Sequence, residues 1–189
     1  MPAAPVGTVS GLVLAAGAGR RFGGPKALAR TAAGTPWIAL AARALTAGGC
    51  HDVTVVLGAE ADAAAALVPT GVTIVRADGW VSGVAASLRA GLQAVASGPA
   101  VSVVVLPVDT PEVPGAAIAR VARRAAAGAL VQATYDGAPG HPVLLGRDHW
   151  GPVAASIRGD IGARPYLIAQ EAQLVECGDL WSGADHDVR

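Results

Sequence analysis

Three cationic side chains lie in a glycine-rich stretch near the start of the chain. Arg20, Arg21 and Lys26 fall within seven positions, beside four glycines at positions 17 to 24. Glycine has no Cβ, so backbone N–H groups can approach phosphate oxygens closely, and the cations supply charge. An ordinary glycine-rich turn needs no such charge. The stretch therefore predicts a phosphate-binding loop.

Two well-known phosphate loops do not fit this stretch. The glycine spacing approaches the dinucleotide fingerprint, but that motif needs a helix starting within the glycines and an acidic residue about 20 positions later. Pro25 would break such a helix, and residues 22–51 contain no Asp or Glu. A Walker loop fails because Pro25 directly precedes Lys26 and Ala27 stands where a metal-binding Ser or Thr is required.

Strand-like and helix-like runs alternate along the chain, which is typical of an α/β fold with a mostly parallel sheet. The turn at residues 136–140 predicts an antiparallel pair within that sheet. A chain of 189 residues suffices for one such domain, residues 1–189, and would be cramped for two. We predict strands at 9–14, 52–57, 72–75, 101–108, 130–135, 141–146 and 173–177, and helices at 37–49, 60–68, 83–92, after 114 and after 164.

The composition restricts the partners and the compartment. Fourteen basic residues balance fourteen acidic ones, so no net charge attracts nucleic acid or an anionic membrane. Apolar residues make up 52%, but no run approaches the roughly 18 residues of a membrane span. Residues 1–10 lack the features of a signal peptide, and Cys50 and Cys177 form no metal or disulfide pattern. We expect a soluble, cytoplasmic protein with free thiols.

The most strand-like run, residues 101–108, ends at Asp109. Ligands of open α/β sheets lie outside the carboxyl ends of the strands, so Asp109 is expected at a ligand site, although Asp-Thr-Pro is also a common turn initiator. A cationic loop and a carboxylate at a strand end are the minimum for binding a nucleoside triphosphate with Mg²⁺. Phosphoryl-type transfer then needs positioning and charge stabilisation, without a protein nucleophile.

Two later segments are open to two interpretations. Ser82 can cap the helix that follows it, and that helix start can also contact a ligand. Residues 158–164 place two cations and an acid around two glycines, which suits a solvated helix start as well as a binding site.

The stretch at residues 12–28, LVLAAGAGRRFGGPKAL, resembles the signature of the nucleotidyltransferases that include the molybdenum cofactor cytidylyltransferases and guanylyltransferases. Phe22 stands for the usual Met. Four further blocks, at residues 79–92, 106–113, 140–150 and 159–167, resemble family segments in the family's order. Relatives often finish with D-x-D-T-P-x-D, whereas Asp187 is followed here by Val188 and Arg189, so the role of this segment stays open.

The resemblance implies a three-layer α/β/α, Rossmann-like fold and Mg²⁺-dependent transfer of a nucleoside monophosphate to a phosphorylated acceptor. Arg21, Lys26 and Asp109 would act in catalysis, and Asp109 would bind Mg²⁺. Asp160 would be a second metal ligand or orient the acceptor. His141 is equally consistent with an acceptor contact and with a structural turn. The nucleotide would be bound by Leu14, Ala15, Ala16, Gly17, Ala18, Gly19, Arg21, Lys26, Ser82 and Ser87.

The donor implied by the resemblance is CTP. LAAG resembles the cytidylyl branch, whereas guanylyl members, which use GTP, usually have LAGG and an aspartate where this chain has Pro25. The implied acceptor is molybdopterin or the molybdenum cofactor, a pterin phosphate, with transient contact to a molybdoenzyme or its maturation proteins. A cytidylyltransferase for a sugar or isoprenoid phosphate should lack the last two blocks. A non-catalytic chaperone that delivers a cofactor is a further alternative, and Asp109 argues against it.

Overall fold

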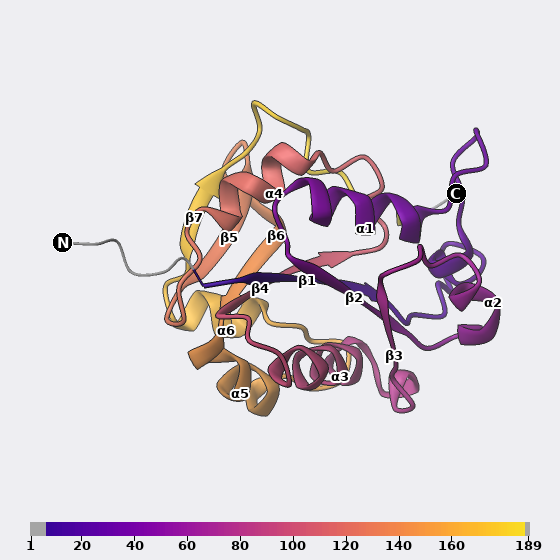
Figure 1. Cartoon of the computed structure of the whole chain (residues 1–189), viewed down its shortest axis with the longest axis horizontal. Helices are drawn as coiled ribbons and strands as arrows, with labels where there is room; N and C mark the ends of the chain where they lie inside the picture. The colour runs from indigo at the N-terminus through magenta and orange to yellow at the C-terminus, as the bar shows by residue number, and fades with distance from the viewer. Residues whose placement is uncertain (1–6, 188–189) are drawn as a thin grey trace.

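The computed structural model describes residues 7–187, and a seven-stranded sheet with helices on both faces forms its centre (Figure 1). The predicted α/β fold, with a mostly parallel sheet, is confirmed. The strands are β1 (Val9–Ala15), β2 (Asp52–Leu57), β3 (Thr73–Arg76), β4 (Ser102–Pro107), β5 (Leu130–Tyr135), β6 (Ala138–Gly146) and β7 (Gln173–Glu176). The helices are α1 (Trp37–Ala47), α2 (Ala61–Ala65), α3 (Val84–Ala96), α4 (Gly115–Ala122), α5 (Arg147–Ser156) and α6 (Arg164–Ala169), and two short 3₁₀ turns are η1 (Lys26–Leu28) and η2 (Trp80–Ser82).

The strand order, β3-β2-β1-β4-β6-β5-β7, places the longest apolar strands in the middle of the sheet. Strand β1 runs parallel to β2 and β4, with Leu14 paired to Pro107 at the end of the β1–β4 ladder. Strand β6 runs antiparallel to both β4 and β5, as the turn before it predicts. The carboxyl ends of β1 and β4 therefore lie side by side, and the first half of β6 lies beside the end of β4.

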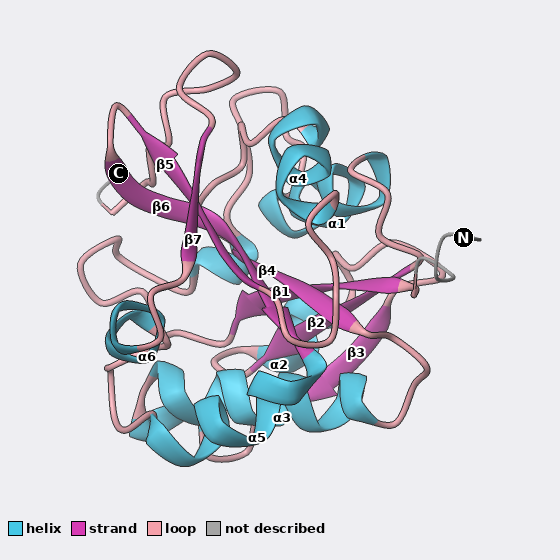
Figure 2. Ribbon diagram, turned by 90° about the vertical axis from the view of Figure 1, so that its left-hand side faces the viewer, coloured by secondary structure: helices cyan, strands magenta, loops and turns pink. Residues whose placement is uncertain are grey.

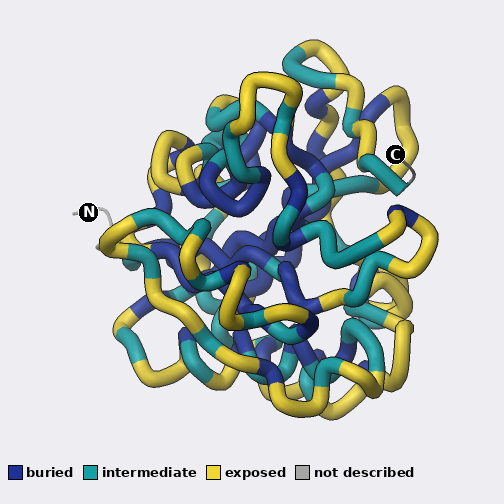
Figure 3. The backbone as a smooth tube through the Cα atoms, turned by 90° about the vertical axis from the view of Figure 1, so that its right-hand side faces the viewer, coloured by how far each residue is buried: buried dark blue, intermediate teal, exposed yellow. Residues whose placement is uncertain are grey.

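Helices cover the sheet on both faces (Figure 2). Helices α1 and α4 pack on one face through buried side chains such as Ile38, Leu45 and Ile118. Helices α3, α5 and α6 pack on the other, where Leu88 and Leu92 are buried. In Figure 3 the backbone is dark blue, the colour of buried residues, along the strands. Yellow, the colour of exposed residues, lies mainly at loops and on the outer faces of helices. Within residues 7–187, no helix is long and apolar enough to cross a membrane.

Helix α5 is the element that the sequence patterns do not predict, because Gly151 and Pro152 lie inside it. Arg147 at its first position donates hydrogen bonds of 2.6 to 2.9 Å to the carbonyls of Ala96, the last residue of α3, and of Gly98 and Ala100 just after it. Trp150 is buried in the core cluster that α5 shares with α3 and donates to the Leu145 carbonyl at 2.9 Å. These long-range contacts outweigh the poor local helix propensity.

Glu176, at the end of β7, ties together the turns around it. Its carboxylate accepts hydrogen bonds from the Thr134 hydroxyl at 2.7 Å and from the backbone N–H groups of Asp136, Gly137 and Gly178 at 2.8 to 3.2 Å. These bonds, led by the one from Thr134, lower the pKa of Glu176 to about 2. The β5–β6 hairpin is thereby fixed to the last strand.

A change of pH should reveal this anchor. The pKa of Glu176 is lowered from 4.5 to about 2 in the folded chain, so the stabilisation is fully present above pH 4.5 and is lost as the pH falls toward 2. Glu176→Gln should lower Tm at neutral pH, and the difference in Tm between this variant and the wild type should become smaller below pH 4.5. Thermal melts from pH 7 to pH 2 measure this, with Glu171→Gln as an exposed control. A gap that stays constant with pH would contradict the role of the charge.

Candidate active site

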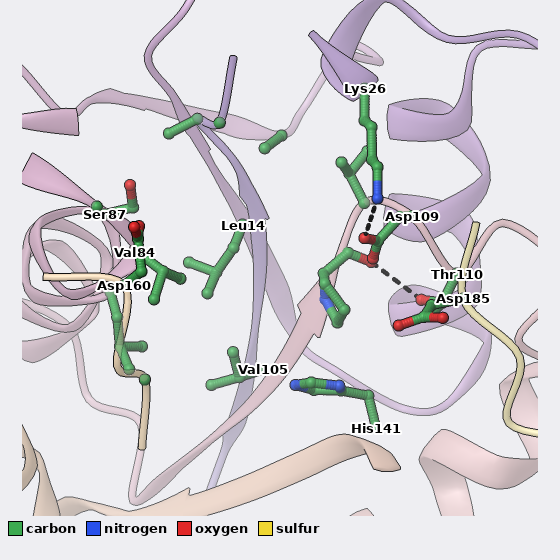
Figure 4. Close-up of a pocket in the computed structure, with 18 of the residues that line it drawn as sticks. Leu14, Lys26, Val84, Ser87, Val105, Asp109, Thr110, His141, Asp160 and Asp185 are labelled. Atoms are coloured by element: carbon green, nitrogen blue, oxygen red, sulfur yellow. Dashed lines mark hydrogen bonds and ion pairs between the residues drawn. The ribbon is translucent and has the colours of Figure 1, made fainter. Parts of the chain in front are cut away.

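A cavity of about 820 Å³ opens at the carboxyl ends of β1 and β4. The Val108 N–H donates to the Leu14 carbonyl at 3.1 Å, so the segment after β4 stays next to the end of β1. The loop after β1 and Asp109 after β4 consequently share one edge of the sheet, as expected for ligands of α/β folds. The cavity floor is apolar and includes Leu14 and Val105 (Figure 4). Val143 of β6 also lines the cavity.

The glycine-rich loop is fixed at its base and at its tip. Gly19 has φ +59°, and a Cβ there would lie 1.9 Å from the Gly24 carbonyl oxygen, so glycine is required. The Gly24 N–H donates back to Gly19 at 3.1 Å and closes the loop. Phe22 is buried, with its ring 5.3 Å from that of Trp37 in α1. The Arg21 side chain remains 80% exposed at the cavity rim.

Lys26 lies between two carboxylates. Its Nζ donates to Asp109 Oδ2 at 2.8 Å and to Asp187 Oδ1 at 3.0 Å (Figure 4 shows the first). Burial lowers the pKa of Lys26, but the hydrogen bonds and the attraction of the two carboxylates outweigh it, so the pKa is raised. An ammonium carries three N–H donors, so one remains for a ligand in the cavity.

Asp109 has one carboxylate oxygen without a partner. Oδ1 is buried and accepts no hydrogen bond from any described residue. Leaving such an oxygen unpaired costs free energy unless a cation or donor joins it. Asp185 lines the same end of the cavity, next to Thr110, the residue after Asp109 (Figure 4). Residues 7–187 contain no cluster of three or more His, Cys, Asp or Glu placed to hold a metal, so an ion bound here would take most ligands from water and phosphate, as Mg²⁺ does.

The C-terminal segment completes this end of the cavity, which the sequence analysis does not predict. The His186 N–H donates to the Asp109 carbonyl at 3.0 Å, and its ring lies 2.9 Å from a Glu112 oxygen and 5.2 Å from the Trp37 ring centroid. This anchor places Asp187 against Lys26, with Arg21 3.5 Å from its other oxygen. The alternation of Asp185 and Asp187 in a polar tail is the available sequence signal.

His141 lies where β6 meets β4. The pairing of Val105 with Val143 carries the start of β6 to the end of β4. Burial lowers the pKa of His141, although the negative charges of Asp109 and Asp185 oppose the shift, so the ring is neutral at neutral pH. The Tyr135 hydroxyl donates to the His141 carbonyl at 2.5 Å. The backbone of His141 thus has a structural partner while the residue also lines the cavity.

The opposite wall is formed by the start of α3 and the turn at 158–162. Asp160 and Ser87 lie there, across the cavity from Asp109 (Figure 4). The structure therefore does not bring Asp160 to Asp109, and the two are not placed to share a metal ion. Ser82 neither caps α3 nor lines the cavity: α3 begins at Val84 with Gly83 at the N-cap position, and no side chain caps it.

The other predicted residues all line the cavity. They are Leu14, Ala15, Ala16, Gly17, Ala18, Gly19, Arg21, Lys26, Ser87, Asp109, His141 and Asp160. The sequence analysis assigns no role to several further lining residues, namely Trp80, Gln132, Arg164, Asp185 and Asp187.

Comparisons with known proteins agree with this geometry. Residues 11–174 match the model of the MobA-like NTP transferase domain family. Nicotine blue oxidoreductase of Paenarthrobacter nicotinovorans is 34% identical over 192 residues, covering 95% of this chain and 92% of that protein. A nucleotidyl transferase from Methanothermobacter thermautotrophicus has a TM-score of 0.76 at 23% identity, covering 90% of this chain and 87% of its own.

A third similar protein was solved with a metal. Rv0371c of Mycobacterium tuberculosis in complex with manganese has a TM-score of 0.73 at 26% identity, covering 90% of this chain and 87% of its own. The family match spans the glycine-rich loop, Asp109 and the turn that carries Asp160. The resemblance of the sequence blocks is thereby confirmed, and the chain belongs to the MobA-like NTP transferase family.

Proposed function

We propose that this nucleotidyltransferase-family protein transfers CMP from CTP to a phosphorylated pterin, molybdopterin or the molybdenum cofactor, and releases pyrophosphate. The observation that carries the proposal is the arrangement of Lys26 and Asp109 at one end of the cavity. The Lys26 ammonium, which can bind phosphate, lies 2.8 Å from Asp109 Oδ2. The other oxygen of that carboxylate, Oδ1, has no hydrogen-bond partner among the described residues. Transient contact with a molybdoenzyme or its maturation proteins would then deliver the product.

Each part of the cavity has a role in this reaction. The backbone of residues 14–19, with Arg21 and Lys26, binds the triphosphate and offsets charge on the departing pyrophosphate. Asp109 and Asp185 would hold Mg²⁺, which, when bound, neutralises phosphate charge and acts as a Lewis acid. His141 and the neighbouring floor of the cavity face the acceptor.

The reaction needs no covalent bond to the protein. An oxygen of the acceptor's phosphate attacks the α-phosphorus of CTP, and the bond from that phosphorus to the bridging oxygen breaks. The electron pair leaves with pyrophosphate, next to Arg21 and Lys26. These residues therefore position the reactants and stabilise charge, in keeping with phosphoryl-type transfer.

Base choice provides a direct test. CTP should be used at least about tenfold better than GTP at equal concentration, a difference of about 1.4 kcal/mol in transition-state binding. Pyrophosphate release in the presence of molybdopterin and Mg²⁺ measures this. A preference for GTP would place the protein in the guanylyl branch and leave the mechanism standing.

A second candidate function is that of a reductase, because the relative at 34% identity is named an oxidoreductase. The cationic loop would then bind the pyrophosphate of a reduced nicotinamide dinucleotide, which transfers hydride to a conjugated acceptor. Asp109 favours the transferase, since hydride transfer does not require a partner for its buried Oδ1. Nicotinamide oxidation with nicotine blue, measured beside pyrophosphate release from CTP, distinguishes the two.

A further inference from the structure

The turn at residues 158–162 is seated on the start of α3. The Ala85 N–H donates to the Gly159 carbonyl at 3.0 Å and fixes the turn there. Gly83 has φ +100°, and a Cβ on it would lie 2.4 Å from the Gly159 oxygen and 2.5 Å from Asp160 Oδ1. Only glycine at position 83 therefore permits this approach, which holds the Asp160 carboxylate at the cavity wall.

Two polar side chains at this wall have no partner within the chain. Asp160 lines the cavity, and its carboxylate forms no hydrogen bond or ion pair with any residue of 7–187. Ser87, one turn into α3, is 5% exposed and lines the same wall. Its hydroxyl likewise has no hydrogen-bond partner among the described residues. The Asp160 carboxylate is exposed and the Ser87 hydroxyl opens to the cavity, so both groups are available to bond a polar ligand bound there.

The charge of the wall indicates which part of a nucleotide lies here. A carboxylate repels phosphate, and three of the four Arg and Lys residues that line the cavity, Arg20, Arg21 and Lys26, belong to the glycine-rich loop (Figure 4 shows Lys26). The fourth, Arg164, begins α6 and forms no ion pair with Asp160. With the triphosphate at the cationic end, the base is the part of the nucleotide that can reach Asp160. Trp80 lines the cavity beside this wall and supplies an aromatic surface.

We infer that Asp160 and Ser87 form the subsite for the nucleobase and that Asp160 selects cytosine over uracil. An ionised carboxylate only accepts hydrogen bonds. The 4-amino group of cytosine donates to it, whereas O4 of uracil would oppose it with lone pairs. The Ser87 hydroxyl can donate to an acceptor on the base. This inference rests on the proposed function and assigns Asp160 to the donor base, where the sequence resemblance implies a metal ligand or an acceptor contact.

Binding of CTP and UTP separates this role from others, because the two nucleotides differ only at the edge of the base. We expect wild-type protein with Mg²⁺ to bind CTP at least about tenfold more tightly than UTP. In Asp160→Asn the amide both donates and accepts, so the CTP/UTP ratio should fall about tenfold. Ser87→Ala should weaken CTP binding by about two- to tenfold. Calorimetry measures all three, with inorganic pyrophosphate as a probe that has no base.

Controls separate failure of this inference from failure of the proposed function. Asp78→Asn removes the same charge from an exposed aspartate outside the cavity and should leave the CTP/UTP ratio unchanged. Pyrophosphate should bind Asp160→Asn as it binds the wild type. An unaltered CTP/UTP ratio in Asp160→Asn, with CTP still bound, would overturn the base contact alone. A wild type that binds pyrophosphate but no nucleoside triphosphate would overturn the proposed function together with the inference.

Discussion

Replacing Asp109 by Asn should lower CMP transfer by at least about 100-fold and leave the fold nearly unchanged. Asn keeps the size of the side chain and most of its hydrogen bonding but removes the charge that a divalent cation requires. The backbone of Asp109 is held independently, by the hydrogen bond from His186 and by the buried strand β4 before it. Asp109→Asn should therefore weaken metal binding and slow CMP transfer without unfolding the protein.

Three measurements on purified Asp109→Asn test this expectation. They are Tm, pyrophosphate release, and Mn²⁺ affinity by electron paramagnetic resonance in the presence of CTP. Asp78→Asn, which changes an exposed aspartate outside the cavity, is the matched control. Mn²⁺ affinity and release like those of the wild type would remove Asp109 from the metal site. Loss of activity accompanied by unfolding would contradict the assignment as well.

Replacing Lys26 by Ala should weaken binding of CTP and pyrophosphate by about 10- to 100-fold, since charge-assisted hydrogen bonds contribute about 1.5–3 kcal/mol each. The same change leaves Asp109 and Asp187 without the cation between them, so Tm should be measured alongside. Arg43→Ala removes an exposed cation of α1 outside the cavity and should leave binding unchanged. Unchanged affinity in folded Lys26→Ala would exclude a phosphate contact.

The wild-type chain permits a second test of Lys26 that does not depend on a variant. Lys26 is the only lysine in the sequence, so amine acetylation can occur only there and at the N-terminus. Saturating pyrophosphate with Mg²⁺ should slow acetylation of Lys26, followed by mass spectrometry, and leave the N-terminal amine unaffected. Equal modification rates with and without pyrophosphate would contradict the contact.

Local sequence signals predicted most of the sheet and one end of the cavity. Strand β4 is a buried run with three consecutive valines, and the rule that ligands lie beyond strand ends predicted a ligand-facing position for Asp109, which lines the cavity. The predicted loop residues line the same cavity. These features depend on short segments whose composition decides their structure.

The remaining features depend on contacts between distant segments. Asp187 meets Lys26 across 161 positions of sequence, and no local pattern specifies that pairing. Helix α5 forms despite Pro152 because Arg147 is bound to the end of α3. Asp160 reaches the start of α3 through the close approach that Gly83 permits, so its separation from Asp109 emerged only from the fold.

The central claim is that CTP gives its CMP group to a phosphorylated pterin at this cavity. The most direct measurement incubates the wild-type protein with α-³²P-labelled CTP, Mg²⁺ and, in parallel samples, molybdopterin or the molybdenum cofactor, and follows label and pyrophosphate together. The account predicts that label appears on the pterin in equal amount to the pyrophosphate released, and that neither appears with Asp109→Asn. CTP left intact with either acceptor and Mg²⁺ present, or pyrophosphate released without labelled pterin, would contradict it.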